Sequence, residues 1–219
     1  MKVLVFDTET TGLPVGRNPS VMDVDKWPHI IQLSFILYDT DSINMIMCED
    51  HIIKLDPSVV ISPESVRIHG ITRSQSMRKG IPLREAISDF NRALRMADWV
   101  VGHNLSFDKR MVMAESNRLR TPQYFTTSSG SGIKEYCTMK NAIELCQIEA
   151  VGQSGRTYYK YPRLDELHQY LFNTMPNGTH DSMGDVLICL RCYGVMRHNH
   201  DIAKSGSTKL RNLYKRYCE

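Results

Sequence analysis

The first third of the chain alternates apolar runs with short polar breaks, a pattern typical of β-strands. Residues 2–7 and 29–38 are rich in apolar, β-branched and aromatic residues, and residues 43–55 form a third strand-like run. Turn residues at 39–42 separate the second run from the third, whereas residues 14–28 carry three prolines and are expected to form a surface loop. Because short turns join neighbouring antiparallel strands, the three runs predict an antiparallel meander.

Beyond residue 61 the apolar residues recur mainly at helical spacings of three and four. The first helix is expected over residues 63–69, with Ser62 as its N-cap and Pro63 at its first helical position. Residues 99–102 predict a short apolar strand, and the low-complexity stretch 126–132 predicts a mobile loop. Further helices are expected over residues 82–97, 107–119, 138–147, 163–172, 181–197 and 204–217, and the one at 181–197 reads as long and amphipathic.

Helix–strand–helix units after three antiparallel strands indicate an α/β fold with a mixed sheet flanked by helices. The 219 residues, 42% of them hydrophobic, suit one domain. We assign residues 1–200 to this domain and residues 201–219 to a basic C-terminal tail. No apolar run reaches the length of a membrane span and the start of the chain lacks signal-peptide features, so a soluble, cytoplasmic protein is expected.

The charge is unevenly distributed although the net charge is only +3. Residues 1–60 hold nine acidic and four basic residues, a balance of −5, so the remainder carries +8. An acidic segment beside a basic remainder fits a cation site next to a surface for a polyanion. The six cysteines are scattered among apolar residues and are expected to be reduced thiols of the core.

Two carboxylates stand at the end of the first apolar strand. Side chains two residues apart in a strand point to the same face, so Asp7 and Glu9 are expected to lie side by side. Acidic residues at a strand end are usually solvated, but here the chain returns to an apolar residue at Leu13. The two charges repel each other unless a cation lies between them, which points to a metal site.

Asp108 and Asp185 have similar settings, each at the start of a predicted helix, where the helix dipole alone favours an acid. Together with the first pair they make a set of four carboxylates, which suits Mg²⁺ or Mn²⁺. Two such ions activate water and stabilise the leaving oxygen in phosphoryl transfer. His180, placed in the loop before the helix that carries Asp185, is the candidate general base, because histidine titrates near neutral pH.

Three motifs in the order FDTETTGL, GHNLSFD and HDSMGD span residues 7–185 and resemble the motifs of the DEDDh (DnaQ-like) 3′→5′ exonucleases. This family includes the epsilon proofreading subunit of bacterial DNA polymerase III. The resemblance implies a ribonuclease H-like fold and stepwise hydrolysis of nucleic acid with two bound metal ions. It also implies the roles of the site residues: metal ligands at Asp7, Glu9, Asp108 and Asp185, and a general base at His180.

The resemblance extends to residues expected to contact the terminal nucleotide. The stretch PESVRIHGI at 63–71 resembles a PExxxxHGI segment of the family. The substrate-binding residues that follow from the resemblance are Thr10, Leu13, Glu64, His69, Asn104 and Phe107. The chain departs from the family pattern at Ser182, where an alanine is usual, at Asp181, and in longer loops at 123–135 and 148–162.

Three further signals have two readings each. Residues 156–163 interleave cations with tyrosines, which suits either single-stranded nucleic acid or packing on the domain. The tail at 202–219 holds five basic residues and one acid, and is read as an amphipathic helix in preference to a strand-binding segment. A zinc site is the weaker reading of CLRC at 189–192 with His198 and His200, because the cysteines fall on an apolar stripe.

These observations predict a metal-dependent 3′→5′ exonuclease that releases nucleoside monophosphates from single-stranded or frayed 3′ ends. DNA is favoured over RNA, and a proofreading role beside a DNA polymerase is compatible with the resemblance. One alternative is an RNA-trimming exoribonuclease, although oligoribonucleases usually carry methionine at the position of Thr10. The other is a non-catalytic nucleic-acid-binding module, which the complete set of catalytic residue types disfavours.

Overall fold

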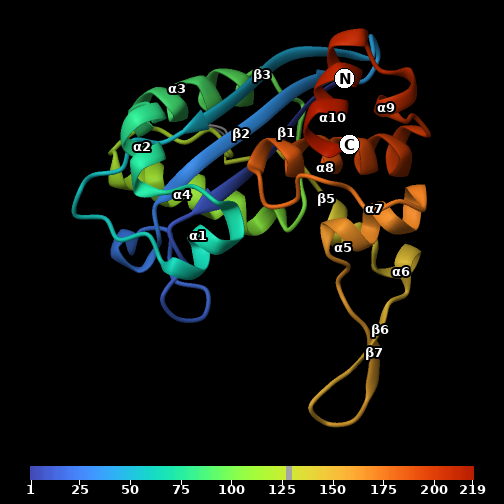
Figure 1. Ribbon diagram of the computed structural model, residues 1–219, viewed down its shortest axis with the longest axis horizontal. Helices are drawn as coiled ribbons and strands as arrows, with labels where there is room; N and C mark the ends of the chain where they lie inside the picture. Colours follow the sequence, from blue (N-terminus) through green and yellow to red (C-terminus); the bar gives the residue numbers. More distant parts are fainter. Residues whose placement is uncertain (127–129) are drawn as a thin grey trace.

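The computed structural model describes residues 1–126 and 130–219, and a five-stranded sheet forms its centre (Figure 1). The strand order is β3-β2-β1-β4-β5, with β1 antiparallel to β2 and parallel to β4. The expected meander with added parallel strands is therefore confirmed. The strands are β1 (Lys2–Thr10), β2 (Ile30–Asp39), β3 (Asn44–Ile52), β4 (Trp99–Gly102) and β5 (Lys134–Cys137).

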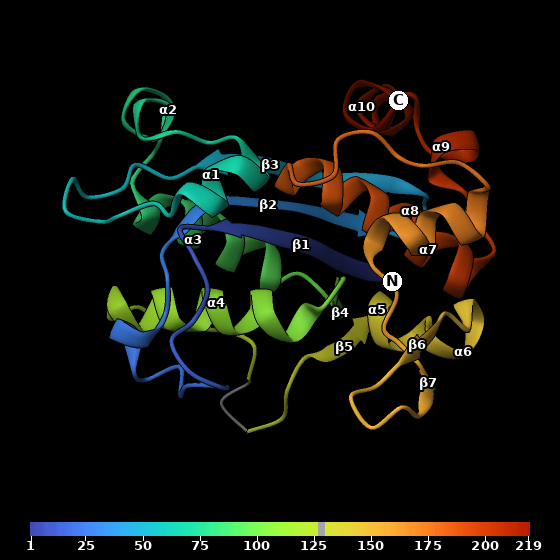
Figure 2. The same ribbon diagram turned by 60° about the horizontal axis from the view of Figure 1, so that its bottom comes forward.

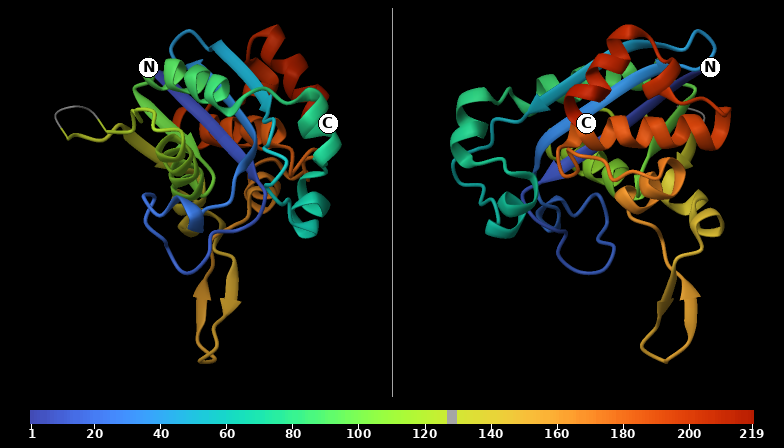
Figure 3. Two further views of the ribbon diagram at one scale, coloured as in Figure 1. Left: turned by 90° about the vertical axis from the view of Figure 1, so that its left-hand side faces the viewer. Right: turned by 45° about the vertical axis from the view of Figure 1, so that its right-hand side comes forward.

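Strand alternation along β1 divides the core into two halves. Leu4 and Phe6 pack in one apolar cluster, whereas Val3 and Val5 pack in the other, on the opposite face of the sheet. The first cluster lies under the helices α3 (Leu83–Leu94) and α4 (Leu105–Arg118), and the second lies under α8 (Ser182–His198). In the left view of Figure 3 the sheet stands between these two layers of helices.

The outer surface of α8 is covered as well, which corrects the expectation of an amphipathic helix at 181–197. The basic tail forms α9 (Ile202–Ser205) and α10 (Thr208–Cys218), and α10 packs along α8. The packing buries Leu210 and Tyr214 of α10 completely or almost so. Because α8 contacts the sheet on one side and α10 on the other, apolar residues surround it.

Local capping signals set the first helix as expected. α1 (Pro63–His69) begins with Ser62, whose Oγ accepts a hydrogen bond from the backbone N–H of Ser65 at 3.0 Å. Gly70 ends it in the left-handed conformation, with a φ of 72°, which glycine adopts without strain. The following α2 (Arg73–Lys79) was not predicted, although Thr72 and Gln75 form a capping box there.

The segment between β5 and α8 differs most from the expectation. The helix expected over 138–147 is two short helices, and the segment expected to be a loop contains a hairpin that projects from the body (Figures 1 and 3). The apolar runs of this segment are too short to show a regular spacing of apolar residues. The sequence therefore does not reveal its strands or the ends of its helices. Its elements are α5 (Thr138–Asn141), α6 (Ile143–Cys146), β6 (Glu149–Val151), β7 (Thr157–Tyr159) and α7 (Leu164–Phe172).

Two smaller points complete the fold. The loop expected at 14–28 contains a short 3-10 turn, η1 (Val24–Lys26). The loop expected at 126–132 falls partly outside the described residues, which omit 127–129. Within the described ranges, no helix combines the length and the apolar character that crossing a membrane requires.

Candidate active site

The end of β1 brings carboxylates from two distant parts of the chain together. One ligand oxygen from each of Asp7, Glu9 and Asp185 lies within 4.8 Å of the other two, and all three residues are partly buried. Asp7 and Glu9 follow Val3 and Val5 on the sheet face that α8 covers, and Asp185 lies in the first turn of α8. Figure 2 shows β1 running between α4 on one side and α8 on the other.

Asp108 reaches the same region from the opposite face of β1. The backbone N–H and the hydroxyl of Thr8 both donate to its Oδ1, at 3.1 and 2.7 Å. Thr8 points to the α4 side because strand side chains alternate. The carboxylate of Asp108 is only 3% exposed and lies outside the 4.8 Å group, but its charge still acts on Glu9. The structure therefore gathers all four predicted carboxylates at one end of β1.

Burial raises the pKa values of all four acids, and the charge of Asp7 raises those of the other three further. Burial raises the pKa of Asp7 to about 7, and it raises that of Glu9 to about 9 with help from the charges of Asp7 and Asp185. Burial and the charge of Asp7 hold the pKa values of Asp108 and Asp185 well above the ordinary value. Ionising any of the four carboxyl groups therefore costs more free energy here than it does in water.

The donor set fits a hard divalent cation. Within residues 1–126 and 130–219, no lysine or arginine forms an ion pair with any of the four carboxylates. Buried carboxylates without a cationic partner are costly, and a bound cation relieves that cost. Oxygen ligands of this kind suit Mg²⁺ or Mn²⁺. A bound cation would relieve the repulsion between two acids two residues apart at the end of an apolar strand.

Asp181 and Ser182, the two departures from the family pattern, hold α8 in place. The carboxylate of Asp181 caps the helix by accepting the backbone N–H groups of Met183 and Gly184, at 3.1 and 3.2 Å. The hydroxyl of Ser182 donates to the backbone carbonyl of Asp7 at 2.8 Å. Both contacts position the turn that carries Asp185.

Sequence reasoning missed two residues that fix this arrangement. Gln32 of β2 accepts the backbone N–H of Ser182 at 3.3 Å, and its own amide donates to Asp50 at 2.8 Å. Ser34 also donates to Asp50, at 2.8 Å. The available signal was the pair of polar residues, Gln32 and Ser34, inside a strand that is otherwise apolar.

His180 lies in the loop before α8, where its backbone N–H donates to Oδ2 of Asp185 at 3.2 Å. It adopts a φ of 70°, and its side chain is exposed. The imidazole is not among the clustered metal-type ligands of the described residues. The structure thus places the backbone of His180, but not its imidazole, against a carboxylate, and the base role stays a prediction.

A cavity of about 410 Å³ adjoins Glu9. Leu13 lines it and is 82% exposed, so its apolar surface is accessible to a ligand. The predicted nucleotide-contacting residues that line the cavity are Thr10, Leu13, Glu64, His69 and Phe107. Asn104 does not line it but lines a neighbouring hollow of about 410 Å³, which shares Leu13 and Phe107. Ser62, Ser65 and Ile68 also line the cavity and were not predicted.

Several solved structures of exonuclease I are similar to this chain. E. coli exonuclease I in complex with a 5cy-dT13 oligonucleotide has a TM-score of 0.64 and 16% identity, over 98% of this chain and 42% of that chain. A product-bound exonuclease I has a TM-score of 0.65 and 17% identity, over 96% of this chain and 45% of that chain. Exonuclease I from Methylocaldum szegediense has a TM-score of 0.60 and 19% identity, with coverage of 90% and 41%.

These TM-scores establish that the chain has the ribonuclease H-like fold of these proteins, and the chain spans less than half the length of each of them. No curated protein sequence matched the chain. The exonuclease family model RNase_T matches residues 4–193, which include all three acidic motifs. The chain therefore belongs to this exonuclease family, in agreement with its resemblance to the DEDDh (DnaQ-like) enzymes.

Proposed function

We propose that the chain is a divalent-metal-dependent 3′→5′ exonuclease that releases nucleoside 5′-monophosphates from single-stranded or frayed 3′ ends of DNA. The observation that carries the proposal is the convergence of Asp7, Glu9 and Asp185 within 4.8 Å, with Asp108 beside them. Membership of the exonuclease family supports the reaction type. The cavity next to Glu9 supports attack at a chain end, because its volume suits one nucleotide.

The four carboxylates are the proposed ligands of two ions, Mg²⁺ or Mn²⁺. Such ions, when bound, activate the attacking water and stabilise the departing 3′ oxygen. Within the cavity, Leu13 and Phe107 offer apolar surface to the terminal base, and Glu64 and His69 offer polar atoms to the sugar. These contacts orient the terminal phosphodiester over the carboxylates.

His180 is the proposed general base that takes the proton of the attacking water. Its backbone N–H holds Asp185, so the residue that accepts the proton and a proposed metal ligand belong to one turn. We expect His180→Ala to bind metal as the parent does and to lose most of its turnover. His198→Ala, at the exposed far end of α8, is the matched control and should keep parent turnover.

One gel experiment tests the reaction. Labelled single- and double-stranded DNA and RNA are incubated with the isolated chain in Mg²⁺, in Mn²⁺ and in chelator. Single-stranded DNA should shorten from its 3′ end in either metal, and the Asp7→Ala and Asp185→Ala variants should not cleave it. Cleavage that continues undiminished in chelator would contradict the metal mechanism. Tight binding without product in Mn²⁺ would instead indicate a non-catalytic binding module.

The same gel decides the substrate. The oligonucleotides bound to exonuclease I in the solved structures favour DNA, as does Thr10 at a position where oligoribonucleases usually carry methionine. Faster trimming of RNA than of DNA would assign the RNA-trimming role. Activity of the chain alone would show that hydrolysis requires no polymerase partner, and a proofreading role would then need a test of polymerase binding.

A further inference from the structure

The β6–β7 hairpin projects from the body of the protein as a narrow arm (Figures 1 and 3). Its two strands pair from Glu149 opposite Tyr159 to Val151 opposite Thr157. The arm exposes large side chains: Val151 is 72% exposed, Tyr158 54% and Tyr159 43%. These side chains contribute little to the core, because they are exposed. A group of large exposed side chains on one hairpin is typical of a surface that binds a ligand or a partner.

The base of the arm is held rigidly. The backbone N–H of Lys160 donates to the carbonyl of Ile148 at 2.9 Å, and its ammonium group pairs with Glu166 of α7 at 2.6 Å. The carbonyl of Pro162 is 3.0 Å from Nε2 of His103. His103 lies in the turn that leads into α4 and Asp108, so the arm is fixed to a catalytic motif.

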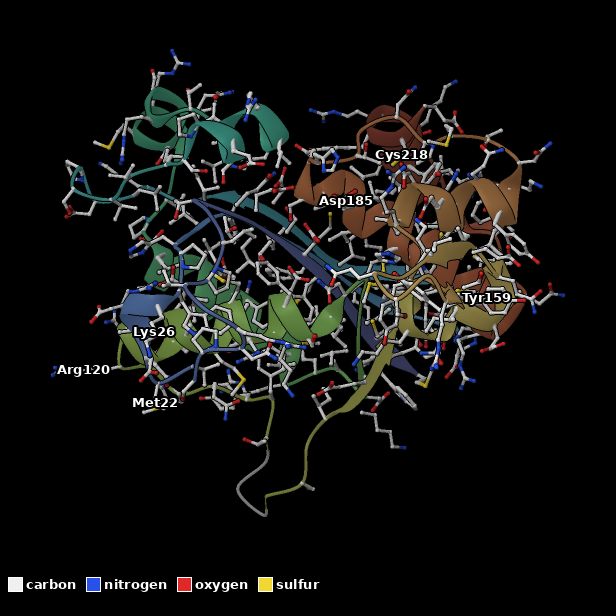
Figure 4. All side chains as sticks on the ribbon, turned by 90° about the horizontal axis from the view of Figure 1, so that it is seen from below. Met22, Lys26, Arg120, Tyr159, Asp185 and Cys218 are labelled. Carbon is white, nitrogen blue, oxygen red and sulfur yellow. The ribbon has the colours of Figure 1, made fainter. Side chains whose placement is uncertain are left out.

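The C-terminal end of the arm leads to the candidate active site. Arg163, at the start of α7, is 68% exposed and pairs with Asp165 at 2.8 Å. Asp165 lies near enough to Asp185 for its charge to contribute to the raised pKa of that carboxylate. Figure 4 views the molecule from the side on which the arm projects and labels Asp185 on α8 and Tyr159 on the arm.

The chemistry of the arm matches single-stranded nucleic acid. Residues 148–163 hold three basic residues and one acidic residue, and they include Tyr158, Tyr159 and Tyr161. Phosphates bind the cations and bases stack on the rings, a combination typical of proteins that follow a single strand. Arg156, at the tip, is exposed and forms no ion pair among the residues that the structure describes, so it is free to bind a phosphate.

We propose that the β6–β7 hairpin binds the single-stranded part of the substrate that lies 5′ of the terminal nucleotide. The proposal rests on the proposed function. The terminal nucleotide is assigned to the cavity at Thr10 and α1, on one side of the carboxylates. In Figure 2, α8, α7 and the arm lie at the other side of the sheet from α1, and the proposal places the rest of the strand there. The arm extends the site beyond the reacting nucleotide and favours long single strands over short ones.

Two arm variants test the proposal: the double variant Tyr158→Ser with Tyr159→Ser, and Arg156→Ser. The matched controls are Tyr170→Ser, an equally exposed tyrosine on α7, and Arg78→Ser, an exposed arginine on α2. The probes are a long labelled oligothymidylate, whose Kd is measured by anisotropy in chelator, and the p-nitrophenyl ester of thymidine 5′-monophosphate, which is too small to reach the arm. Circular dichroism checks that each variant is folded.

The double variant should weaken oligothymidylate binding by about 5- to 150-fold for each stacked base that is lost. Arg156→Ser should reduce the slope of log K against log salt by about 0.7 if one phosphate contact is lost. Both should hydrolyse the nitrophenyl ester at the parent rate, and both controls should bind oligothymidylate with the parent Kd.

Equal binding of oligothymidylate by the double variant and the parent would overturn the proposal. A variant that loses ester hydrolysis by the same factor as oligothymidylate binding would overturn it too, because such a loss would indicate a distorted active site. A parent dimer that dissociates in the double variant, with unchanged binding, would assign the arm to self-association. If the parent hydrolyses neither the ester nor oligothymidylate in Mg²⁺ or Mn²⁺, the proposed function fails, whereas the anisotropy measurement in chelator still decides the role of the arm.

Discussion

Replacing Glu9 with glutamine should stabilise the metal-free protein while it removes a metal ligand. Glu9 lies in a group of four carboxylates, and burial together with the charges of four neighbouring aspartates raises its pKa from 4.5 to about 9. A glutamine of the same shape cannot ionise. The variant therefore avoids the cost that the parent carries at every pH between these two values.

The sign follows from proton binding. Below pH 4.5 Glu9 is protonated in both the folded and the unfolded chain, so the substitution changes little. As the pH rises towards 9, the unfolded chain releases this proton and the folded chain keeps it, so the free energy of unfolding of the parent falls by about 1.4 kcal/mol per pH unit. The ceiling at pH 8 is about 5 kcal/mol, and screening of this partly exposed group reduces it to about half.

Thermal unfolding in chelator measures the effect. A gain of about 2.5 kcal/mol raises Tm by roughly 5–10 °C in a chain of this size at pH 8, and the gain should vanish near pH 4. Glu64→Gln, an exposed carboxylate lining the same cavity, is the control and should leave Tm unchanged. A Glu9→Gln variant no more stable than the parent at pH 8, or equally stabilised at pH 4, would refute the repulsion argument.

The remaining predictions concern metal binding and two structural contacts. Because Glu9 holds a proton at pH 8, Mn²⁺ binding should release protons, and the calorimetric enthalpy should vary with the ionisation enthalpy of the buffer; identical enthalpies in all buffers would contradict the raised pKa. Glu115→Gln should lower the free energy of unfolding in urea by about 3 kcal/mol, because Glu115 is fully buried and pairs with Arg118; an unchanged urea midpoint would show that the pair is not important. Gly184→Ala should lower kcat, because the new Cβ would lie 2.2 Å from the carbonyl of Gly178 and displace the loop before α8; parent kcat and Tm would show that this loop moves freely.

The sequence predicted those features of the site that depend on residues close together in the chain. The alternation of Asp7 and Glu9 on a strand predicted one shared face, and Ser62 with Pro63 predicted the start of a helix. Both patterns are short-range, since they depend only on strand or helix geometry over a few residues. The three motifs, read in order, also predicted which acids belong together.

Tertiary structure alone decided how those acids meet. The hydroxyl of Ser182 bonds to the carbonyl of Asp7 across 175 residues, and Thr8 bonds to Asp108 across 100. Such contacts depend on strand register and on the helix packed on each face, which no local pattern specifies. The burial of most of α8, as far as Gly194, and the projecting arm at β6–β7 were likewise invisible in the sequence. Burial of a helix depends on the elements that pack on its outer side. The strands of the arm are too short to show the alternation of apolar and polar residues that predicts a strand.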